Sequence, residues 1–175
     1  MSMTLNAAVL KKYMNDVFVE TGSFDGRGAI FAVFAGFKKV ITIEVDHGRA
    51  VEARKRIVGF PEITLHEGDS LDVFPKIIAS LDIRATLFLD SHPIGYGDPT
   101  KGGRIRYPLV EELKALDKIS KRKDHSIIID DKNAFKAFGT SDEEVAALLL
   151  KVNPAYKISI EYNAGGLLDM IGAMI

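Results

Sequence analysis

Two hydrophobic patterns alternate along the chain. Apolar residues in unbroken runs or at every second position predict strands, whereas apolar residues three and four positions apart predict helices. The strand pattern covers residues 16–20, 40–45, 63–66, 85–89, 126–129, 156–162 and 169–175. The helical pattern covers residues 5–14, 26–36, 47–58, a segment capped by Ser70 or Asp72 with Pro75 in its first turn, 109–120 and 141–152. This order of elements predicts an α/β domain.

The order also predicts where a site would form. Repeated strand–helix units give right-handed crossovers, a parallel sheet and helices on both of its faces. The segment Asn163–Gly166 separates the last two strands as a hairpin turn would, so one antiparallel strand is expected at a sheet edge. In such sheets ligands bind at the carboxyl ends of the strands. The residues that follow the strands at 16–20, 40–45, 85–89 and 126–129 are therefore the first candidates.

Composition is that of one globular domain. The chain has 175 residues, of which 47% are apolar and 27% charged, and we predict a single domain over residues 1–175. It has no cysteine, which excludes disulfides, thiolate zinc sites and cysteine nucleophiles. Residues 1–6 show no signal-peptide pattern, and no apolar run approaches the about 20 residues that span a bilayer. We therefore expect a cytoplasmic protein without a membrane partner.

Charge gives no sign of a nucleic-acid partner. The formal net charge is −1, so no global attraction to a polyanion is expected. The densest cationic cluster, residues 121–123, is interpreted as a solvated helix end that complements the helix dipole.

The turn after the first strand is rich in glycine. It reads Glu20-Thr-Gly22-Ser-Phe-Asp-Gly26-Arg-Gly28 and leads directly into a helix. Glycines let the backbone approach a ligand, and the first amides of a helix can face it. Gly22 and Gly26 are too far apart for the dinucleotide-binding fingerprint, which disfavours a nicotinamide oxidoreductase.

Acidic residues follow the next two strands. Glu44, in preference to Asp46, is placed about 20 residues beyond the glycine turn, where a carboxylate can accept hydrogen bonds from two ribose hydroxyls. Asp69 and Ser70 follow the third strand. They could hydrogen-bond an adenine edge, cap the next helix, or do both.

Four segments, taken in order, resemble class I S-adenosylmethionine-dependent methyltransferases. They are ETGSFDGRG, ITIEVD, HEGDS and TLFLDSH, and the resemblance runs from about Asp16 to Ile175. It implies a Rossmann-like three-layer α/β/α sandwich with a seven-stranded, mostly parallel sheet of order 3-2-1-4-5-7-6 and an antiparallel C-terminal strand. It also implies S-adenosylmethionine as cofactor and S-adenosylhomocysteine as product. One departure is Phe24, where a second, closely spaced glycine is commoner.

The resemblance also implies roles for individual residues. The methionine part of the cofactor would be surrounded by Glu20, Gly22, Ser23 and Gly26. The ribose would bind Glu44, and the adenine would bind Asp69 and Ser70.

Three carboxylates are expected close together after two neighbouring strands. Asp90 follows one strand, and Asp130 and Asp131 follow the other. Like charges this close repel, and a hard cation would neutralise them. The arrangement is similar to that of metal-dependent O-methyltransferases, which implies magnesium bound by these residues, where it would activate a substrate hydroxyl. Alternatively, Asp90 accepts the substrate proton or contacts the cofactor without a metal, and Asp131 caps a turn.

His92 is a candidate general base, because histidine is nearly neutral at working pH. The alternative is a structural histidine that stabilises its own loop. Asp90-Ser-His-Pro93 also lacks the Pro-Pro-aromatic signature of amino-methyltransferases, which disfavours a nitrogen acceptor.

The glycine-rich segment Ser91–Pro108 is interpreted either as a substrate lid or as a surface loop. A lid carrying Lys101, Arg104 and Arg106 could recognise an anionic group. The leading prediction is methyl transfer to an oxygen of a small molecule. The alternatives are a nucleic-acid or protein acceptor, contacted by these cations and by residues 121–123, and a cofactor-binding module without catalysis. The family that the chain resembles usually recognises its substrate with N-terminal extensions or inserts, and few residues here precede the first strand. The resemblance therefore implies either a small substrate held by residues 91–108 or a homodimer that completes the pocket.

Overall fold

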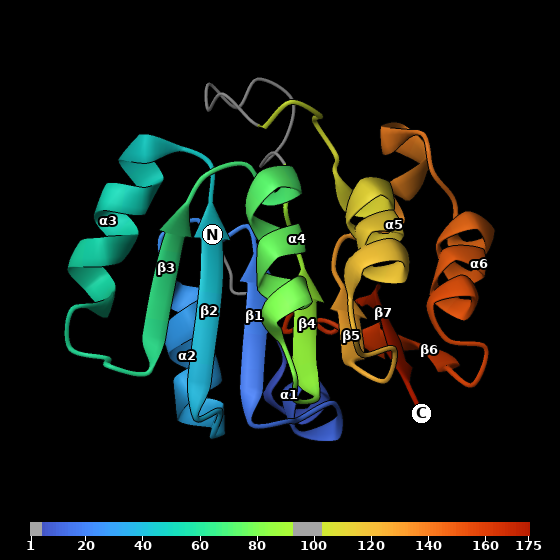
Figure 1. The fold of residues 1–175 in the computed structure, drawn as a ribbon, viewed down its shortest axis with the longest axis horizontal. Helices are drawn as coiled ribbons and strands as arrows, with labels where there is room; N and C mark the ends of the chain where they lie inside the picture. The colour runs from blue at the N-terminus through green and yellow to red at the C-terminus, as the bar shows by residue number, and fades with distance from the viewer. Residues whose placement is uncertain (1–4, 93–102) are drawn as a thin grey trace.

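A computed structural model describes residues 5–92 and 103–175 of the chain. Seven strands alternate with helices (Figure 1). The strands are β1 (Val17–Thr21), β2 (Lys39–Glu44), β3 (Ile63–Glu67), β4 (Ala85–Leu89), β5 (Ser126–Ile129), β6 (Lys157–Tyr162) and β7 (Leu168–Met174). The α-helices are α1 (Ala7–Lys12), α2 (Arg27–Ala35), α3 (His47–Ile57), α4 (Ser70–Ser80), α5 (Leu109–Ile119) and α6 (Asp142–Val152).

The strands form one sheet of order β3-β2-β1-β4-β5-β7-β6. All neighbours pair in parallel except β7, which is antiparallel to both β5 and β6. The predicted fold class, strand order and antiparallel strand are thereby confirmed. Because β1 lies between β2 and β4, the chain passes to one side of β1 after α2 and to the other side after α4. The carboxyl end of β1 is therefore the topological switch point of the sheet.

Helices cover both faces of the sheet (Figure 1). One core joins the sheet to α4, α5 and α6 through side chains such as Phe74, Leu113 and Leu149. The other joins it to α1 and α2 through side chains such as Leu10, Ala32 and Phe88. Central strands enclosed in this way are buried at every position, which explains their unbroken apolar runs.

The start of α4 differs from the prediction. Asp69 caps the helix by accepting a hydrogen bond from the Leu71 amide at 2.9 Å, so the helix begins at Ser70. Pro75 therefore lies inside the helix and not in its first turn. At this position a proline removes one backbone hydrogen bond. The predicted cap at Ser141 is confirmed, because its hydroxyl accepts from the Glu144 amide at 3.2 Å.

One element was not predicted from the sequence. A 3₁₀ helix, η1 (Lys132–Phe138), follows β5 and ends at Gly139, whose φ is +80°. Phe135 of η1 is buried, and the ring of Phe138 stacks on that of Tyr107 with centroids 4.5 Å apart. A 3₁₀ helix has three residues per turn, so its apolar side chains do not follow the 3.6-residue period that predicts α-helices.

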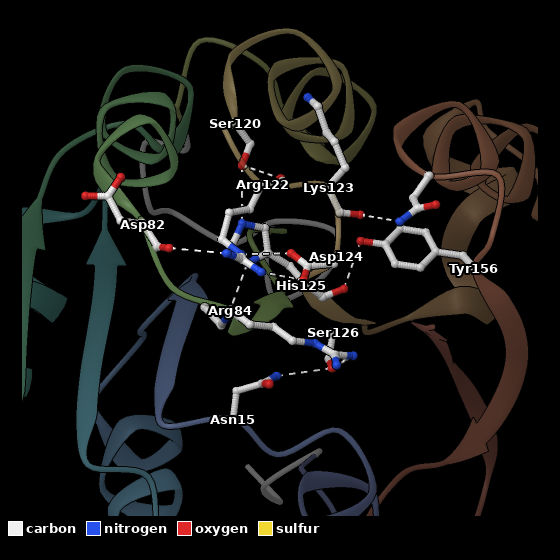
Figure 2. A network of polar contacts seen from close by, with 12 residues as sticks. Asn15, Asp82, Arg84, Ser120, Arg122, Lys123, Asp124, His125, Ser126 and Tyr156 are labelled. Atoms are coloured by element: carbon white, nitrogen blue, oxygen red, sulfur yellow. Dashed lines mark hydrogen bonds and ion pairs between the residues drawn. The ribbon is translucent and has the colours of Figure 1, made fainter.

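The cationic residues 121–123 precede β5 in the chain, and Arg122 and Lys123 belong to a polar network there (Figure 2). Lys123 caps α5, donating from its ammonium group to the carbonyl oxygens of Leu116 and Asp117. Arg122 pairs with Asp124 at 2.6 Å, and Lys121 pairs with Asp82 at 3.1 Å. The helix-end interpretation is confirmed. Among the described residues, no helix combines the length and apolar character that membrane crossing requires.

His125 is the buried centre of this network. Its Nδ1 accepts from the Ala85 amide at 3.1 Å, which leaves the proton on Nε2 to donate to the Ser120 hydroxyl oxygen at 3.2 Å. Burial lowers the pKa of His125 to about 4. The folded protein therefore holds a neutral imidazole, whereas the unfolded chain takes up a proton near pH 6.5.

This difference predicts acid sensitivity at one residue. The contribution of His125 to stability is present above pH 6.5 and is lost as the pH falls towards 4, by about 3 kcal/mol in total. The variant His125→Asn keeps an acceptor for the Ala85 amide but does not titrate. Urea unfolding at several pH values should show the stability difference between wild type and this variant shrinking over that range. An equally large change in the exposed control His66→Asn would contradict the assignment.

Candidate active site

The carboxyl ends of four neighbouring strands meet at one edge of the sheet. The Gly22 amide donates to the Ile43 carbonyl at 3.0 Å, which joins the end of β1 to β2. The Asp90 amide donates to the Thr21 carbonyl at 3.1 Å, and the Asp130 amide donates to the Leu89 carbonyl at 3.2 Å. The predicted residues that follow β1, β2, β4 and β5 are therefore brought together.

Gly22 is required by the contact between β1 and β4. Its φ is +85°, and a Cβ atom there would lie 2.2 Å from the Asp90 carbonyl oxygen. Gly26 has a φ of +83°, and a Cβ there would lie 3.3 Å from the Cβ of Ala53 on α3. Both glycines are thus explained by backbone conformation and packing. Their contact with a cofactor stays a prediction.

Phe24 adopts the backbone conformation that glycine usually supplies. Its φ is +52°, which is rare for a bulky side chain and costs about 1–3 kcal/mol. The Phe24 amide donates to Glu44 Oε2 at 2.7 Å, and the Arg49 guanidinium lies 4.7 Å from the centre of its ring. The departure from the usual glycine spacing therefore leaves the turn in a left-handed conformation that these contacts hold.

Glu44 ends β2 and is only 4% exposed. Its carboxylate accepts from the amides of Phe24 at 2.7 Å and Asp46 at 2.8 Å. Burial raises the pKa of Glu44, although these two backbone hydrogen bonds oppose the shift. The Asp46 carboxylate instead caps α3 through the Arg49 amide at 2.9 Å. These roles agree with the preference for Glu44 over Asp46 as the ligand-binding residue.

Glu20 is buried at the end of β1, beneath the first turn of α2. The Thr42 hydroxyl donates to Glu20 Oε2 at 2.6 Å, and a Cβ on Gly28 would lie 2.1 Å from Glu20 Oε1. Burial, reinforced by the negative charges of Asp90 and Glu44, raises the pKa of Glu20 to about 8. Gly28 therefore makes room for this carboxyl group.

Ser23 follows Gly22 and is buried. Within residues 5–92 and 103–175, its hydroxyl has no hydrogen-bond partner. A buried hydroxyl without a partner is energetically unfavourable, so this atom is suited to a polar ligand group.

Asp69 and Ser70 are engaged in contacts of their own. Besides capping α4, the Asp69 carboxylate accepts from the Arg104 amide at 2.7 Å. The Arg104 guanidinium also pairs with Asp72 at 2.8 Å. Ser70 hydrogen-bonds to Glu112 of α5. The capping alternative for Asp69 is confirmed, whereas the adenine contact stays a prediction.

His92 lies between two carboxylates. Its Nε2 is 2.7 Å from Asp90 Oδ1 and 2.6 Å from Asp131 Oδ2. Burial alone would lower the pKa of His92, but the two carboxylates outweigh it and raise the pKa to about 11. The imidazole is therefore a cation in this state, and its role as a general base stays a prediction. Asp131 directly precedes η1 with a φ of +53°, but its side chain makes no capping hydrogen bond there and pairs with His92 instead.

Magnesium binding by Asp90, Asp130 and Asp131 stays a prediction. In the part of the chain that the structure describes, no three carboxylate or imidazole side chains form a group that could hold a metal ion. Asp130, which precedes Asp131, is buried. The positive charge on His92 offsets part of the negative charge of Asp90 and Asp131.

Two features of the site were missed in the sequence. Glu112 is a buried carboxylate on the apolar face of α5, and its position three residues after Leu109 and four before Leu116 was the available signal. Tyr107 stacks on Phe138 of η1. Burial, with the charges of Asp131 and Asp90 adding to it, raises the pKa of Tyr107.

Residues 93–102 of the predicted lid, including Lys101, lie outside the described residues.

Known proteins match this chain through its three-dimensional structure. No protein-family model and no curated protein sequence matches the chain. Solved structures do match. The O-methyltransferase TomG from Streptomyces achromogenes, crystallised with S-adenosylmethionine, has 15% identity and a TM-score of 0.63 over 97% of this chain and 77% of its own. The fold is that of the Rossmann-like methyltransferases.

Two further matches show how widely this fold is used. A candidate rRNA methylase from Clostridium thermocellum has 12% identity and a TM-score of 0.67, over 99% of this chain and 98% of its own. Spermidine synthase from Thermotoga maritima has 14% identity and a TM-score of 0.61, over 91% of this chain and 53% of its own. The methyltransferase fold therefore does not by itself select an acceptor or a reaction.

The raised pKa of Glu20 predicts a pH-dependent stability. The unfolded carboxyl ionises near pH 4.5, whereas the folded one keeps its proton up to about pH 8. Stability therefore falls across this window as the pH rises, relative to Glu20→Gln, by up to about 1.4 kcal/mol per pH unit. Urea unfolding of the ligand-free proteins at pH 5, 6, 7 and 8 measures the difference. A difference that stays constant with pH would contradict the assignment.

Proposed function

We propose that the protein is an S-adenosylmethionine-dependent methyltransferase that transfers a methyl group to an oxygen of a small molecule. The observation that carries the proposal is the meeting of three features at the switch point of the sheet. These are the strained turn after β1, the buried carboxylate of Glu44 after β2, and the Asp90–His92–Asp131 group after β4 and β5. The matching structures include O-methyltransferases with S-adenosylmethionine or its product bound.

The cofactor-facing residues fit the proposed ligand. Two of the four lone-pair positions on the Glu44 carboxylate are used by backbone amides, so two remain for the hydroxyls of a ribose. The unpartnered hydroxyl of Ser23 can bond the methionine part, and a carboxylate at Glu20 suits its positive charge. When bound, the cofactor supplies a methyl group on a sulfonium. Proximity of positive charge would favour ionisation of Glu20.

The acceptor-facing residues would orient a hydroxyl group and receive its proton. Asp90, His92 and Asp131 form a hydrogen-bonded group that can exchange a proton with an acceptor, and Tyr107 and Phe138 provide stacked rings nearby. The bound cofactor would supply the methyl group to the acceptor oxygen, with S-adenosylhomocysteine as the leaving group. Because His92 is already protonated, a carboxylate of Asp90 or Asp131 would receive the hydroxyl proton.

A small-molecule acceptor is favoured over a nucleic acid. Arg104 lies near the site but pairs with Asp69 and Asp72. Residues 121–123 lie at the opposite end of the sheet, where Asp82 and Asp124 pair with two of them. These cations therefore do not form one continuous surface for a phosphate backbone. The cytoplasmic location and the homodimer remain predictions.

Cofactor binding can be tested at Glu44. Isothermal titration calorimetry should show S-adenosylmethionine and S-adenosylhomocysteine binding to the wild type. Hydrogen bonds to a charged group contribute about 1.5–3 kcal/mol each, so Glu44→Gln should weaken binding about tenfold or more. The control is Glu67→Gln at the end of the neighbouring strand, where the carboxylate pairs with His47 and Arg54. Equal losses in both variants, or no binding to the wild type, would reject the proposed cofactor site.

Methyl transfer can be tested with a panel of hydroxyl acceptors that includes 3,4-dihydroxybenzoate. We expect S-adenosylhomocysteine to accumulate, and His92→Asn to lower kcat by about 10²–10⁴-fold without weakening cofactor binding. Each assay is run with magnesium and with EDTA. Loss of activity in EDTA, restored by magnesium, would support the metal predicted on Asp90, Asp130 and Asp131, and insensitivity to EDTA would reject it. Cofactor binding without transfer to any acceptor would contradict catalysis and favour a non-catalytic binding module.

A further inference from the structure

Glu112 is a buried carboxyl group on a helix, and side chains from other segments hydrogen-bond to it. It lies in the first turns of α5 and is 1% exposed. Its Oε1 accepts from the Ser91 hydroxyl at 2.6 Å, and its Oε2 accepts from the Thr21 hydroxyl at 3.4 Å. The Ser70 hydroxyl bonds to it as well. Among the described residues, the side chains that hydrogen-bond to this carboxylate are thus all hydroxyls.

Each of the three hydroxyls belongs to a different segment of the candidate site. Thr21 ends β1 and precedes Gly22, and its hydroxyl oxygen also accepts from the Asp90 amide at 3.3 Å. Ser70 is the first residue of α4, directly after Asp69. Ser91 stands between Asp90 and His92. A single carboxylate therefore joins the turn after β1, the turn before α4 and the turn after β4.

Core packing does not account for this side chain. Leu109, Leu113 and Leu116 lie on the same buried face of α5, and a leucine at position 112 would continue that face without a polar group. Burying a carboxyl group costs free energy unless hydrogen bonds compensate for lost water. Burial raises the pKa of Glu112 to about 7, even though the hydroxyls of Ser70, Ser91 and Thr21 lower it. Its hydrogen bonds are therefore directed at the site and not at the core.

We propose that Glu112 is a positioning residue of the methyltransferase site. It holds the turns after β1 and β4 and the start of α4 at fixed distances from one another. The cofactor-facing and acceptor-facing residues therefore keep fixed relative positions. It acts through Thr21, Ser70 and Ser91 and does not itself contact cofactor or acceptor. This inference rests on the proposed function, because it assigns a purpose to the alignment of those three segments.

A positioning role and a merely structural role predict different results. If Glu112 only stabilised the fold, its replacement would lower the melting temperature but leave the affinity of the folded protein for ligand unchanged. If it aligns the three segments, the folded variant should bind ligand more weakly. Glu112→Gln is the suitable variant, because it keeps the shape but offers one acceptor oxygen to three hydroxyls.

The experiment measures S-adenosylhomocysteine binding by calorimetry below the melting temperature of each protein, with far-UV circular dichroism as the check of folding. We expect Glu112→Gln to bind at least tenfold more weakly than the wild type. The matched control is Glu111→Gln, which removes an exposed carboxylate that pairs with Lys114 on the same helix and should change affinity less than twofold. Wild-type affinity in folded Glu112→Gln would overturn the proposal.

A second variant removes the donor of the same hydrogen bond instead of its acceptor. Ser91→Ala removes the 2.6 Å donor and leaves the carboxylate in place, so it should also weaken binding. The loss in the double variant should be smaller than the sum of the two single losses, because both remove one interaction. Full additivity would contradict the coupling, and Ser91→Ala keeps the test open if Glu112→Gln does not fold.

Amide chemical shifts of the ligand-free proteins separate failure of this inference from failure of the proposed function. In Glu112→Gln the shifts of Gly22, Ser70 and Ser91 should change, whereas in Glu111→Gln they should not. If these shifts change but the wild type binds no S-adenosylhomocysteine, the proposed function fails although the three segments are coupled. If the wild type binds and the shifts of these residues do not change, the positioning role fails alone.

Discussion

The close backbone contact between the ends of β1 and β4 is the constraint on which the site depends. At Gly22 any side chain would meet the Asp90 carbonyl oxygen at 2.2 Å, and the φ of +85° also favours glycine. Because these strands are neighbours in a parallel sheet, this contact fixes where the chain leaves both of them. The strained turn that contains Phe24 follows the end of β1, and the ion-paired His92 follows the end of β4, so the positions of both depend on this contact.

A cluster of buried carboxyl groups is the second organising feature. Burial raises the pKa of Glu20, Glu44, Asp90 and Glu112, because each carboxylate has lost water at the crowded edge of the sheet. Backbone amides and hydroxyls, together with the His92 imidazole, compensate in part. A ligand that carries positive charge would be stabilised in such an environment. Burial of these carboxyl groups thus explains both why the site lowers the stability of the fold and why a cationic cofactor suits it.

The sequence predicted the strands to within one residue at each end, because enclosed parallel strands appear as unbroken apolar runs. It also predicted which strand ends converge, since that follows from topology. It did not predict how the side chains pair. The bond from the Arg104 amide to Asp69, the insertion of His92 between Asp90 and Asp131, and the role of Glu112 depend on contacts between segments distant in sequence. The η1 helix was missed because a 3₁₀ helix has three residues per turn and does not show the 3.6-residue period of an α-helix.

The most direct test of the account is titration of ¹⁵N-labelled protein with S-adenosylhomocysteine, followed through backbone amide shifts. The largest changes should occur at Gly22, Ser23, Phe24 and Asp46, the amides at the carboxyl ends of β1 and β2. The amide of His125, at the opposite end of the sheet, should not change. No changes at all, or changes concentrated around His125, would contradict the claim that this edge of the sheet is a cofactor site.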